Sequence, residues 1–368
     1  MLGPIILCGL YLAKYVRLNK TITTIKIGNL LPLNPNLMAV AIKMKNGTEL
    51  AREDLLEKYK DLLSIEMHHA NGCFENETIP SVQKFIHDDV SIIGASFCLF
   101  GHIPILPLTE TNKIITFNTA SNPDVVLNKR YAFSINVEIK DQAREMADFA
   151  FKKMAGRRAI IMHLDTPFGH DYKKYFAREF EKLGGQLLFN IPNAPDGRDY
   201  HESISKIIAA NPDVIITAHF GVPLGLFLKE IRAAGITSPI VGNYETEDSD
   251  VLDAAGSASE GVIFASSESV EKSDIMEKFE KRYVRKFGVA PDVVVTSSYD
   301  SIVIGVESYL KCNGDRDCMS DEIHQTKEFQ GAGGVITIKS SGATDKPTTF
   351  KFIKNRTFLY YKDRDLTF

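Results

Sequence analysis

Short runs of apolar residues alternate along the chain with longer segments in which apolar residues recur at helical spacing. The first such pair is Ile25–Leu31, a buried strand by its pattern, and Ala39–Tyr59, a helix. The alternation restarts with a strand at 158–163 and continues to a strand at 239–242. Strand–helix alternation of this length predicts right-handed crossovers and mostly parallel sheets, and therefore an α/β fold.

After Ala265 the pattern becomes rich in helices, and it closes with strands at Gly333–Ile338 and Thr349–Ile353, the latter in a hairpin over 350–358. The expected late helices span 270–287, 294–311 and 318–327. The restart and the late return predict two lobes built from discontinuous segments, with a hinge where the chain crosses between them. We expect a signal-like or tail segment over 1–22, a first lobe over 23–137 plus 267–345, a second lobe over 138–266 plus 346–362, and crossings near 136–138, 265–268 and 340–348.

Composition narrows the function classes. A chain of 368 residues can hold two cores, and its net charge of -4, with no basic stripe, argues against nucleic acid or an anionic membrane surface as a partner. Gly-x-Ser-x-Gly, His-Glu-x-x-His, Cys-x-x-Cys and the phosphate loop are all missing. Gly331–Gly334 fails as a dinucleotide loop, because a helix is expected before it and a strand after it. We therefore expect no enzyme, no cofactor and no metal site.

The N-terminus has some, but not all, of the features of an export signal. Leu2–Ala13 is nearly all apolar, about the length of a signal-peptide core and short for a transmembrane helix. The usual preceding basic region is missing, and Lys14, Arg17 and Lys20 follow instead. We expect a degenerate export signal or a weak anchor, the alternative being a loosely packed tail.

Four cysteines form two plausible pairs. Cys73 and Cys98 each follow a predicted strand, and adjacent strands of one sheet would bring them within bridging reach. Cys312 and Cys318 flank a pentapeptide rich in turn-forming residues. Disulfides indicate an oxidising compartment. Four free thiols in a cytosolic protein are the open alternative, and a metal site built from Cys73 with two nearby histidines is less favoured.

Polar turns follow the predicted strands. In open parallel sheets, ligands bind beyond the carboxyl ends of the strands, where helix N-termini offer free backbone N–H groups to a carboxylate. The turns expected at this edge are 32–41, 95–102, 118–123, 164–170, 218–223 and 243–250. Their Asn, Thr, Ser, Gly and His residues suit a binding cleft, although loops of α/β proteins are commonly polar.

Seven short signatures occur in a characteristic order. They are Ile25–Leu33, Ser91–Ala95, Thr119–Pro123, Arg158–Ile161, Glu181–Gly185, Ala210–Ile215 and Glu260–Val262. In this order and spacing the chain resembles the periplasmic solute-binding proteins of the branched-chain amino-acid (Leu/Ile/Val-binding) type. The resemblance implies the type 1 periplasmic-binding fold: two lobes, each a mostly parallel sheet flanked by helices, with three hinge crossings in a Venus-flytrap arrangement. The spacing of Cys73 and Cys98 also looks like the bridge that this family has in its first lobe.

The resemblance also implies ligand contacts, position by position. Thr119, Ala120 and Ser121 match the turn that grips an amino-acid ligand. Leu99 stands where a hydroxyl is usual, so the backbone N–H groups of Phe100 and Gly101 are expected to serve instead. From the second lobe the resemblance implies Phe168, and Phe220 with His219 beside it, as lids, and Tyr244 and Glu245 near the ligand's amino group. The missing hydroxyl points away from an unmodified branched-chain amino acid.

The expected function is therefore that of an extracytoplasmic protein that captures a small solute, such as an amino acid or amide, for an ABC-type importer. The implied partners are the small-molecule ligand and the membrane permease, with the protein itself a monomer. The implied location is periplasmic or extracellular, with an N-terminal membrane anchor as an option. The alternative is a ligand-sensing module of a receptor or regulatory system, without transport; a degenerate relative that binds nothing is a third possibility.

Overall fold

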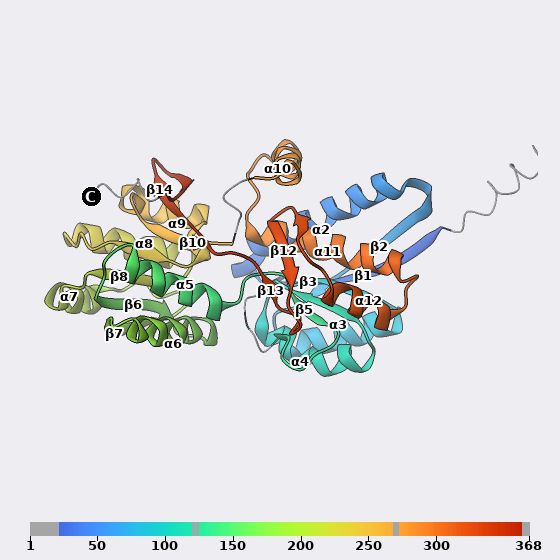
Figure 1. Cartoon of the computed structure of the whole chain (residues 1–368), viewed down its shortest axis with the longest axis horizontal. Helices are drawn as coiled ribbons and strands as arrows, with labels where there is room; N and C mark the ends of the chain where they lie inside the picture. Colours follow the sequence, from blue (N-terminus) through green and yellow to red (C-terminus); the bar gives the residue numbers. More distant parts are fainter. Residues whose placement is uncertain (1–21, 120–121, 123–124, 268–271, 363–368) are drawn as a thin grey trace, which may run out of the picture.

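The computed structural model describes residues 22–119, 122, 125–267 and 272–362. Two lobes lie side by side along the longest axis of the molecule (Figure 1). Each lobe contains one main sheet, and the helices cover both faces of each sheet. The α/β fold with mostly parallel sheets, predicted from the alternating pattern, is confirmed.

The main sheet of the first lobe has five parallel strands in the order β2-β1-β3-β4-β5. Their bounds are β1 Thr23–Leu31, β2 Leu63–Asn71, β3 Ile92–Ser96, β4 Ile115–Asn118 and β5 Ala132–Ser134. The strands β3, β4 and β5 are short runs buried on both faces, as in Ile92–Ser96, where all five residues are buried, whereas the edge strand β2 is partly exposed. Burial on both faces is typical of parallel strands between two helix layers.

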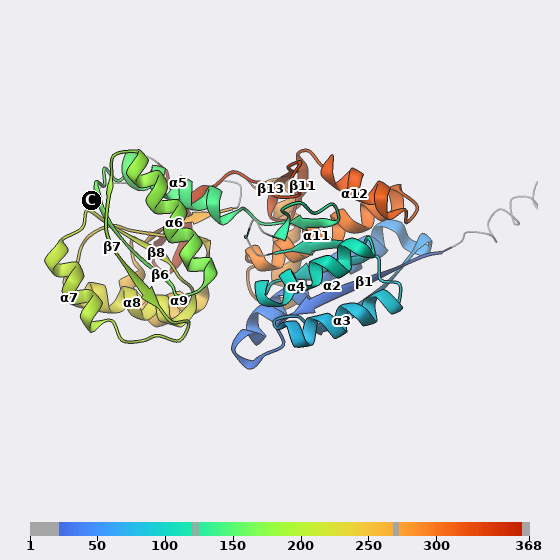
Figure 2. The same cartoon turned by 90° about the horizontal axis from the view of Figure 1, so that it is seen from below.

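Helices cover the two faces of this sheet in pairs. α2 (Met38–Tyr59) packs against α11 (Val293–Lys311), and α3 (Glu75–His87) packs against α4 (Leu99–Thr111) (Figure 2). α11 therefore returns late in the chain to complete a layer that α2 begins. The remaining elements of this lobe are η1 Pro35–Leu37, η2 Lys60–Leu62, α10 Asp274–Phe287, α12 Arg316–His324, and the three-stranded antiparallel sheet of β11 Phe329–Gly331, β12 Gly334–Ile338 and β13 Thr344–Asp345.

Two late helices begin at residues that differ from the prediction. The expected helix 270–287 starts at Asp274, because the Ser273 side chain accepts a hydrogen bond from the Met276 N–H and caps the first turn. The expected helix 318–327 spans Arg316–His324, because the Asp315 side chain caps it in the same way. In both cases the cap residue, and not the apolar spacing, sets the start.

The second lobe has a seven-stranded sheet in the order β15-β14-β10-β9-β8-β6-β7. Its parallel strands are β6 Arg158–Leu164, β7 Gln186–Asn193, β8 Val214–Ala218, β9 Ile240–Gly242 and β10 Ile263–Ser266. The predicted C-terminal hairpin is confirmed as β14 (Thr349–Lys354) and β15 (Thr357–Tyr360), antiparallel to each other and added beside β10. Its turn residues Asn355 and Arg356 both have positive φ, as a two-residue hairpin turn of type I′ requires.

Helices again form two layers on this sheet. One core joins α5 (Ile139–Lys152) and α6 (Pro167–Lys182) to the sheet, and a second core lies on the opposite face. The elements of that opposite layer are α7 His201–Ala210, α8 Gly221–Ala233, α9 Ser249–Ala255 and the short helices η4 Tyr244–Thr246 and η5 Gly256–Ser259.

The chain crosses between the two main sheets three times: between β5 and α5, between β10 and α10, and between β13 and β14. The first and third crossings are hydrogen-bonded to each other. Val137 and Thr344 form a parallel bridge, the Ser134 N–H donates to the Gly342 carbonyl at 3.0 Å, and the Thr344 hydroxyl donates to the Ser134 carbonyl. The three predicted crossings are therefore present, and two of them form a paired hinge. The residue bounds given above for the two lobes stay a prediction.

The disulfide Cys73–Cys98 is present, but one premise of its prediction was wrong. The strands before the two cysteines, β2 and β3, are not neighbours, because β1 lies between them. The bridge closes because the loop after β2 passes directly over the end of β1. A Cβ on Gly72 would lie 2.5 Å from the Leu30 Cβ, so only glycine lets this loop come so close.

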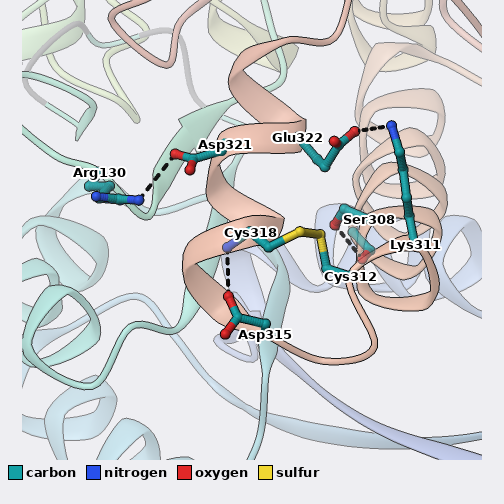
Figure 3. The surroundings of a disulfide bond; sticks show 9 residues. Arg130, Ser308, Lys311, Cys312, Asp315, Cys318, Asp321 and Glu322 are labelled. Carbon is teal, nitrogen blue, oxygen red and sulfur yellow. Dashed lines mark hydrogen bonds and ion pairs between the residues drawn. A yellow bond between two sulfur atoms is a disulfide. The ribbon is translucent and has the colours of Figure 1, made fainter.

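The second disulfide, Cys312–Cys318, joins the end of α11 to the first turn of α12 (Figure 3). Around it, the Asp315 carboxylate accepts from the Cys318 N–H at 2.8 Å and Lys311 pairs with Glu322. The bridge therefore fixes a tight turn that is also held by a helix cap. Within the described residues, no helix has the length and apolar character needed to cross a membrane.

Asp300 is a fully buried carboxylate that supports this architecture. It lies on α11, is fully buried, and accepts hydrogen bonds from the Ala332 N–H at 2.6 Å and the Gly333 N–H at 3.0 Å. Burial raises its pKa to about 6, against the opposing effect of the Lys346 ammonium. Lys346 is itself 5% exposed and belongs to the third crossing. One carboxylate thus connects α11, the turn before β12 and the hinge.

We predict that Asp300→Ala destabilises the protein by about 3–5 kcal/mol, because it leaves two buried N–H groups without their acceptor and removes the carboxylate that interacts electrostatically with buried Lys346. Denaturant unfolding measures the change. Asp321→Ala is the matched control, since this carboxylate pairs with Arg130 at 3.1 Å on the surface and should cost less than about 1 kcal/mol. Equal losses in the two variants would refute the structural role of Asp300.

Candidate functional site

The first turn of α4 lies at the carboxyl end of β3 and contains three of the predicted ligand contacts. Leu99 packs with its side chain against Val125, Val126 and Ala343. Phe100 is 64% exposed and lines a surface hollow of about 760 Å³. The other lining residues of this hollow are Phe74, Glu75, Asn76, Ile79 and Pro80. Leu99 therefore has a packing role, whereas Phe100 presents an apolar face to solvent.

Backbone N–H groups in this turn are only partly available. The Gly101 N–H already donates to the Cys98 carbonyl at 3.2 Å. In the described part of the chain, no hydrogen bond uses the N–H groups of Leu99 and Phe100. These two N–H groups, at the positive end of the helix dipole, are the ones free to receive a carboxylate.

Thr119 lies just after β4 and is 3% exposed. Its N–H and its hydroxyl both donate to the Ser96 carbonyl, at 2.9 and 3.0 Å. The hydroxyl therefore links β4 to β3 and keeps only acceptor capacity for a ligand. Ala120 and Ser121, the other two residues of the predicted turn, lie outside the described residues, so the roles given to them stay predictions.

The two lobes touch directly beside this turn. The Asn122 amide lies 3.4 Å from the Asp171 carboxylate, which belongs to α6 of the second lobe. The turn after β4 therefore faces the second lobe.

In the second lobe, the Gln142 side chain connects Tyr244 to Tyr172, and Phe168 packs on the Tyr172 ring. Phe168, in the first turn of α6, packs edge to face against Tyr172 with ring centroids 5.0 Å apart. The Gln142 carbonyl oxygen accepts from the Tyr172 hydroxyl at 2.5 Å and from the Tyr244 N–H at 3.2 Å. This network fixes the start of η4 relative to α6, and so positions two of the predicted ligand contacts.

His219 and Phe220 lie together after β8. His219 is fully buried, and its Nδ1 accepts from the Phe220 N–H at 2.9 Å, while Phe220 is half-buried at the start of α8. Burial lowers the pKa of His219. A neutral, buried imidazole that orders the backbone suits a positioning role, and leaves Phe220 as the residue of this pair with an exposed surface.

Glu245 has the most altered electrostatics among the predicted residues. Its pKa is raised to about 7, mainly by burial and in smaller part by the nearby carboxylates of Asp248 and Asp292, against the opposing effects of a hydrogen bond with Tyr244 and of the Lys43 ammonium. Asp292 and Lys43 belong to the first lobe, where they form an ion pair at 2.8 Å. Glu245 therefore lies at the boundary between the lobes, and it interacts electrostatically with Asp248 of its own lobe and with Lys43 and Asp292 of the other lobe.

Lys43 and Asp292 were missed by sequence reasoning. Lys43 is on the second turn of α2, and Asp292 caps α11 by accepting from the Val294 and Val295 N–H groups. The pKa of Lys43 is raised by Asp292 and also by Asp248 and Asp250 of the second lobe, although burial opposes this shift. A lysine in an amphipathic helix has no distinguishing sequence signal, so only the folded arrangement reveals it.

The charges gathered at this boundary are unbalanced. Four carboxylates, those of Glu245, Asp248, Asp250 and Asp292, interact electrostatically with the single ammonium of Lys43. Such an excess of negative charge favours a ligand that carries a positive group. Among the described residues, no group of histidine, cysteine and acidic side chains is arranged to hold a metal ion.

Comparison with known proteins places this geometry in a family. Residues 83–350 match the family described as periplasmic binding protein. Leu/Ile/Val-binding protein homolog 3 of Brucella melitensis is 18% identical over 332 residues, which cover 88% of this chain and 89% of that protein. The Leu/Ile/Val-binding protein of Citrobacter freundii is 18% identical over 59% of this chain and 60% of its own length.

Solved structures show the same fold. The leucine-binding protein LivK of Thermotoga maritima has a TM-score of 0.83 at 21% identity, with 92% of this chain and 98% of that chain covered. A solute-binding protein of an ABC transporter from R. palustris, solved with benzoate, has a TM-score of 0.81 at 16% identity and coverages of 92% and 95%. The chain therefore belongs to the periplasmic binding protein family, whose members bind solutes rather than transform them, and it has the fold of the branched-chain amino-acid type.

Proposed function

We propose that this protein captures a small solute carrying an ammonium group, such as an amino acid or an amino-acid amide, between its lobes for an ABC-type importer. Support for the class of function comes from the family match and from relatives that are named as Leu/Ile/Val-binding proteins or solved as parts of ABC transporters. The charges at the boundary between the lobes add a reason to prefer a ligand with an ammonium group over a plain carboxylic acid.

The observation that carries the proposal is the position of Glu245. Its carboxylate belongs to the second lobe, yet it interacts with Lys43 and Asp292 of the first lobe. A ligand ammonium placed there would meet a surplus of carboxylates from both lobes. An aromatic acid such as benzoate, which carries only a negative charge, would be repelled by the same surplus. The charge pattern therefore favours an amino-bearing ligand over a plain carboxylic acid.

The remaining groups suit the rest of such a ligand. The free N–H groups of Leu99 and Phe100 offer a carboxylate or carbonyl two donors at the N-terminus of α4. Phe168 and Phe220 supply half-buried aromatic surface from the second lobe for an apolar side chain. The ligand would thus be held by polar groups at its amino-acid end and by rings at the other.

Capture would proceed by rotation of the lobes about the paired hinge. A ligand that contacts both lobes binds the closed arrangement better than the open one, so its differential affinity shifts the population toward closure. The closed form would present a different surface to the permease than the open form does. The two disulfides support an oxidising location outside the cytoplasm. Leu2–Ala13, the suggested export signal or anchor, lies outside the described residues.

The raised pKa of Glu245 gives the proposal a pH test. Below pH 7 the carboxyl group is mostly protonated and neutral, and above it the group is mostly charged. Affinity for an amino-acid ligand should therefore rise on the order of tenfold between pH 6 and pH 8, because the ligand ammonium stays protonated over this range. Isothermal titration calorimetry with leucine measures it, because the amine of leucine, unlike that of an amino-acid amide, keeps its proton over this range.

Glu245→Gln should weaken binding about tenfold to a hundredfold at pH 8 and make affinity nearly independent of pH. Asp253→Asn is the matched control, since Asp253 lies on α9 and pairs with Arg356 away from the first lobe. It should leave both affinity and pH dependence unchanged. Binding of benzoate in preference to every amino compound tested, or an unchanged pH profile in Glu245→Gln, would reject this ligand class.

Substitutions at Thr119 and Ser121 should have different effects, the first on the stability of the unliganded protein and the second on ligand affinity. Thr119→Val removes a buried hydroxyl that bonds the Ser96 carbonyl, so it should destabilise the unliganded protein by about 1 kcal/mol. Ser121→Ala should weaken ligand binding while the unliganded stability stays the same. Thermal denaturation with and without ligand separates the two effects. Equal ligand affinity in Ser121→Ala and the parent protein would remove Ser121 from the site.

A further inference from the structure

A second hollow lies in the second lobe, outside the site proposed above. It is a groove of about 370 Å³ between α5 and α6, which lie side by side on one face of that lobe (Figure 2). Its lining consists of Lys140, Arg144, Tyr175, Arg178, Glu179 and Lys182. Arg178 lies ten residues after Phe168 on the same helix, or about 15 Å along its axis, so the groove is separate from the proposed ligand contacts.

Positive charge predominates in the groove. Four cations, two from each helix, face it, with a single carboxylate among the lining residues. That carboxylate, Glu179, pairs with Lys182 at 2.9 Å. Arg144 lies 3.5 Å from Asp141, whose carboxylate also accepts from Lys339 at 2.8 Å. The nearby acidic groups are therefore shared or already paired.

Among the described residues, two of the cations are not held in an ion pair, although Lys140 interacts electrostatically with Glu138. In the part of the chain that the structure describes, neither Lys140 nor Arg178 forms an ion pair. The hydroxyl of Tyr175, between the two helices, makes no hydrogen bond in the same part of the chain. The four cations are exposed side chains, and together with the Tyr175 hydroxyl they line one hollow between the two helices.

We propose that this groove is a second binding site, for an anionic phosphate group. A phosphate dianion accepts several hydrogen bonds at once, and a guanidinium donates two in a planar fork that matches its oxygens. Arg144 and Arg178 approach from different helices, with Lys140 and Lys182 as additional charges. A monovalent carboxylate would use only part of this donor set. The phosphate could belong to a free solute or to an anionic lipid headgroup, and the chemistry of recognition is the same for both.

Calorimetric titration of the full chain with inorganic phosphate and with pyrophosphate, against sodium acetate at matched ionic strength, tests the site. Co-sedimentation with vesicles of phosphatidylglycerol, compared with phosphatidylcholine alone, tests the lipid source. We expect phosphate or pyrophosphate to bind more tightly than acetate by about tenfold or more. Binding to the free anions points to a solute, and binding only to the anionic vesicles points to a headgroup.

Variants separate this site from diffuse electrostatics. Lys140→Gln combined with Arg178→Gln should weaken binding at least about tenfold, and Arg178→Lys, which keeps the charge but loses the fork, should weaken it by a smaller factor. The matched control is Lys152→Gln combined with Lys206→Gln, which removes the same charge from lysines already paired with Asp148 and Glu202. Circular dichroism confirms that each variant is folded.

The control pair should retain phosphate binding within a factor of about two. Equal losses in the two double variants, or no preference for phosphate over acetate together with no binding to anionic vesicles, would overturn the proposal. Binding of leucine in the cleft is measured in the same variants and should not change. Failure of the phosphate site therefore leaves the function proposed for the cleft untouched, and the reverse also holds.

Discussion

The buried carboxylate of Asp300 is the interaction on which the arrangement of the first lobe and the hinge depends. Removing a charge from water is costly, and the cost is offset here by two backbone donors and the ammonium of Lys346. Because Lys346 lies in the third crossing, the same carboxylate ties a helix of one lobe to the segment that leads to the other. The glycine-rich turn at 331–334, which superficially resembles a nucleotide loop, is thus an internal structural turn.

Much of the fold follows from the apolar pattern alone. Buried runs such as Ile25–Leu31 and the restart at 158–163 indicate parallel strands, and the late hairpin is clear from its polar turn. The order of strands within a sheet is not contained in that pattern. The prediction therefore placed Cys73 and Cys98 on neighbouring strands, whereas Gly72 lets a loop pass over the end of β1. This close packing of a loop on a strand is a tertiary contact, and the only trace of it in the sequence is the glycine at position 72.

The candidate site was predictable to a smaller degree. Family resemblance indicated Glu245, Phe168 and Phe220, and the structure places their elements at the carboxyl ends of strands in the second lobe. Lys43 and Asp292 could not be found this way, because their importance comes from the approach of one lobe to the other. Leu99 illustrates the opposite case, since its apolar side chain is explained by packing against Val125, Val126 and Ala343.

The bridge between Val137 and Thr344 has a consequence for the mechanics of the molecule. Two crossings that are bonded laterally cannot easily slide past each other, so shear between the lobes is resisted while bending across the pair is not. Bending of the two lobes about the paired crossings is then the favoured relative motion. In the closure proposed above, the paired crossings would therefore keep both lobes on the same path for any solute that binds.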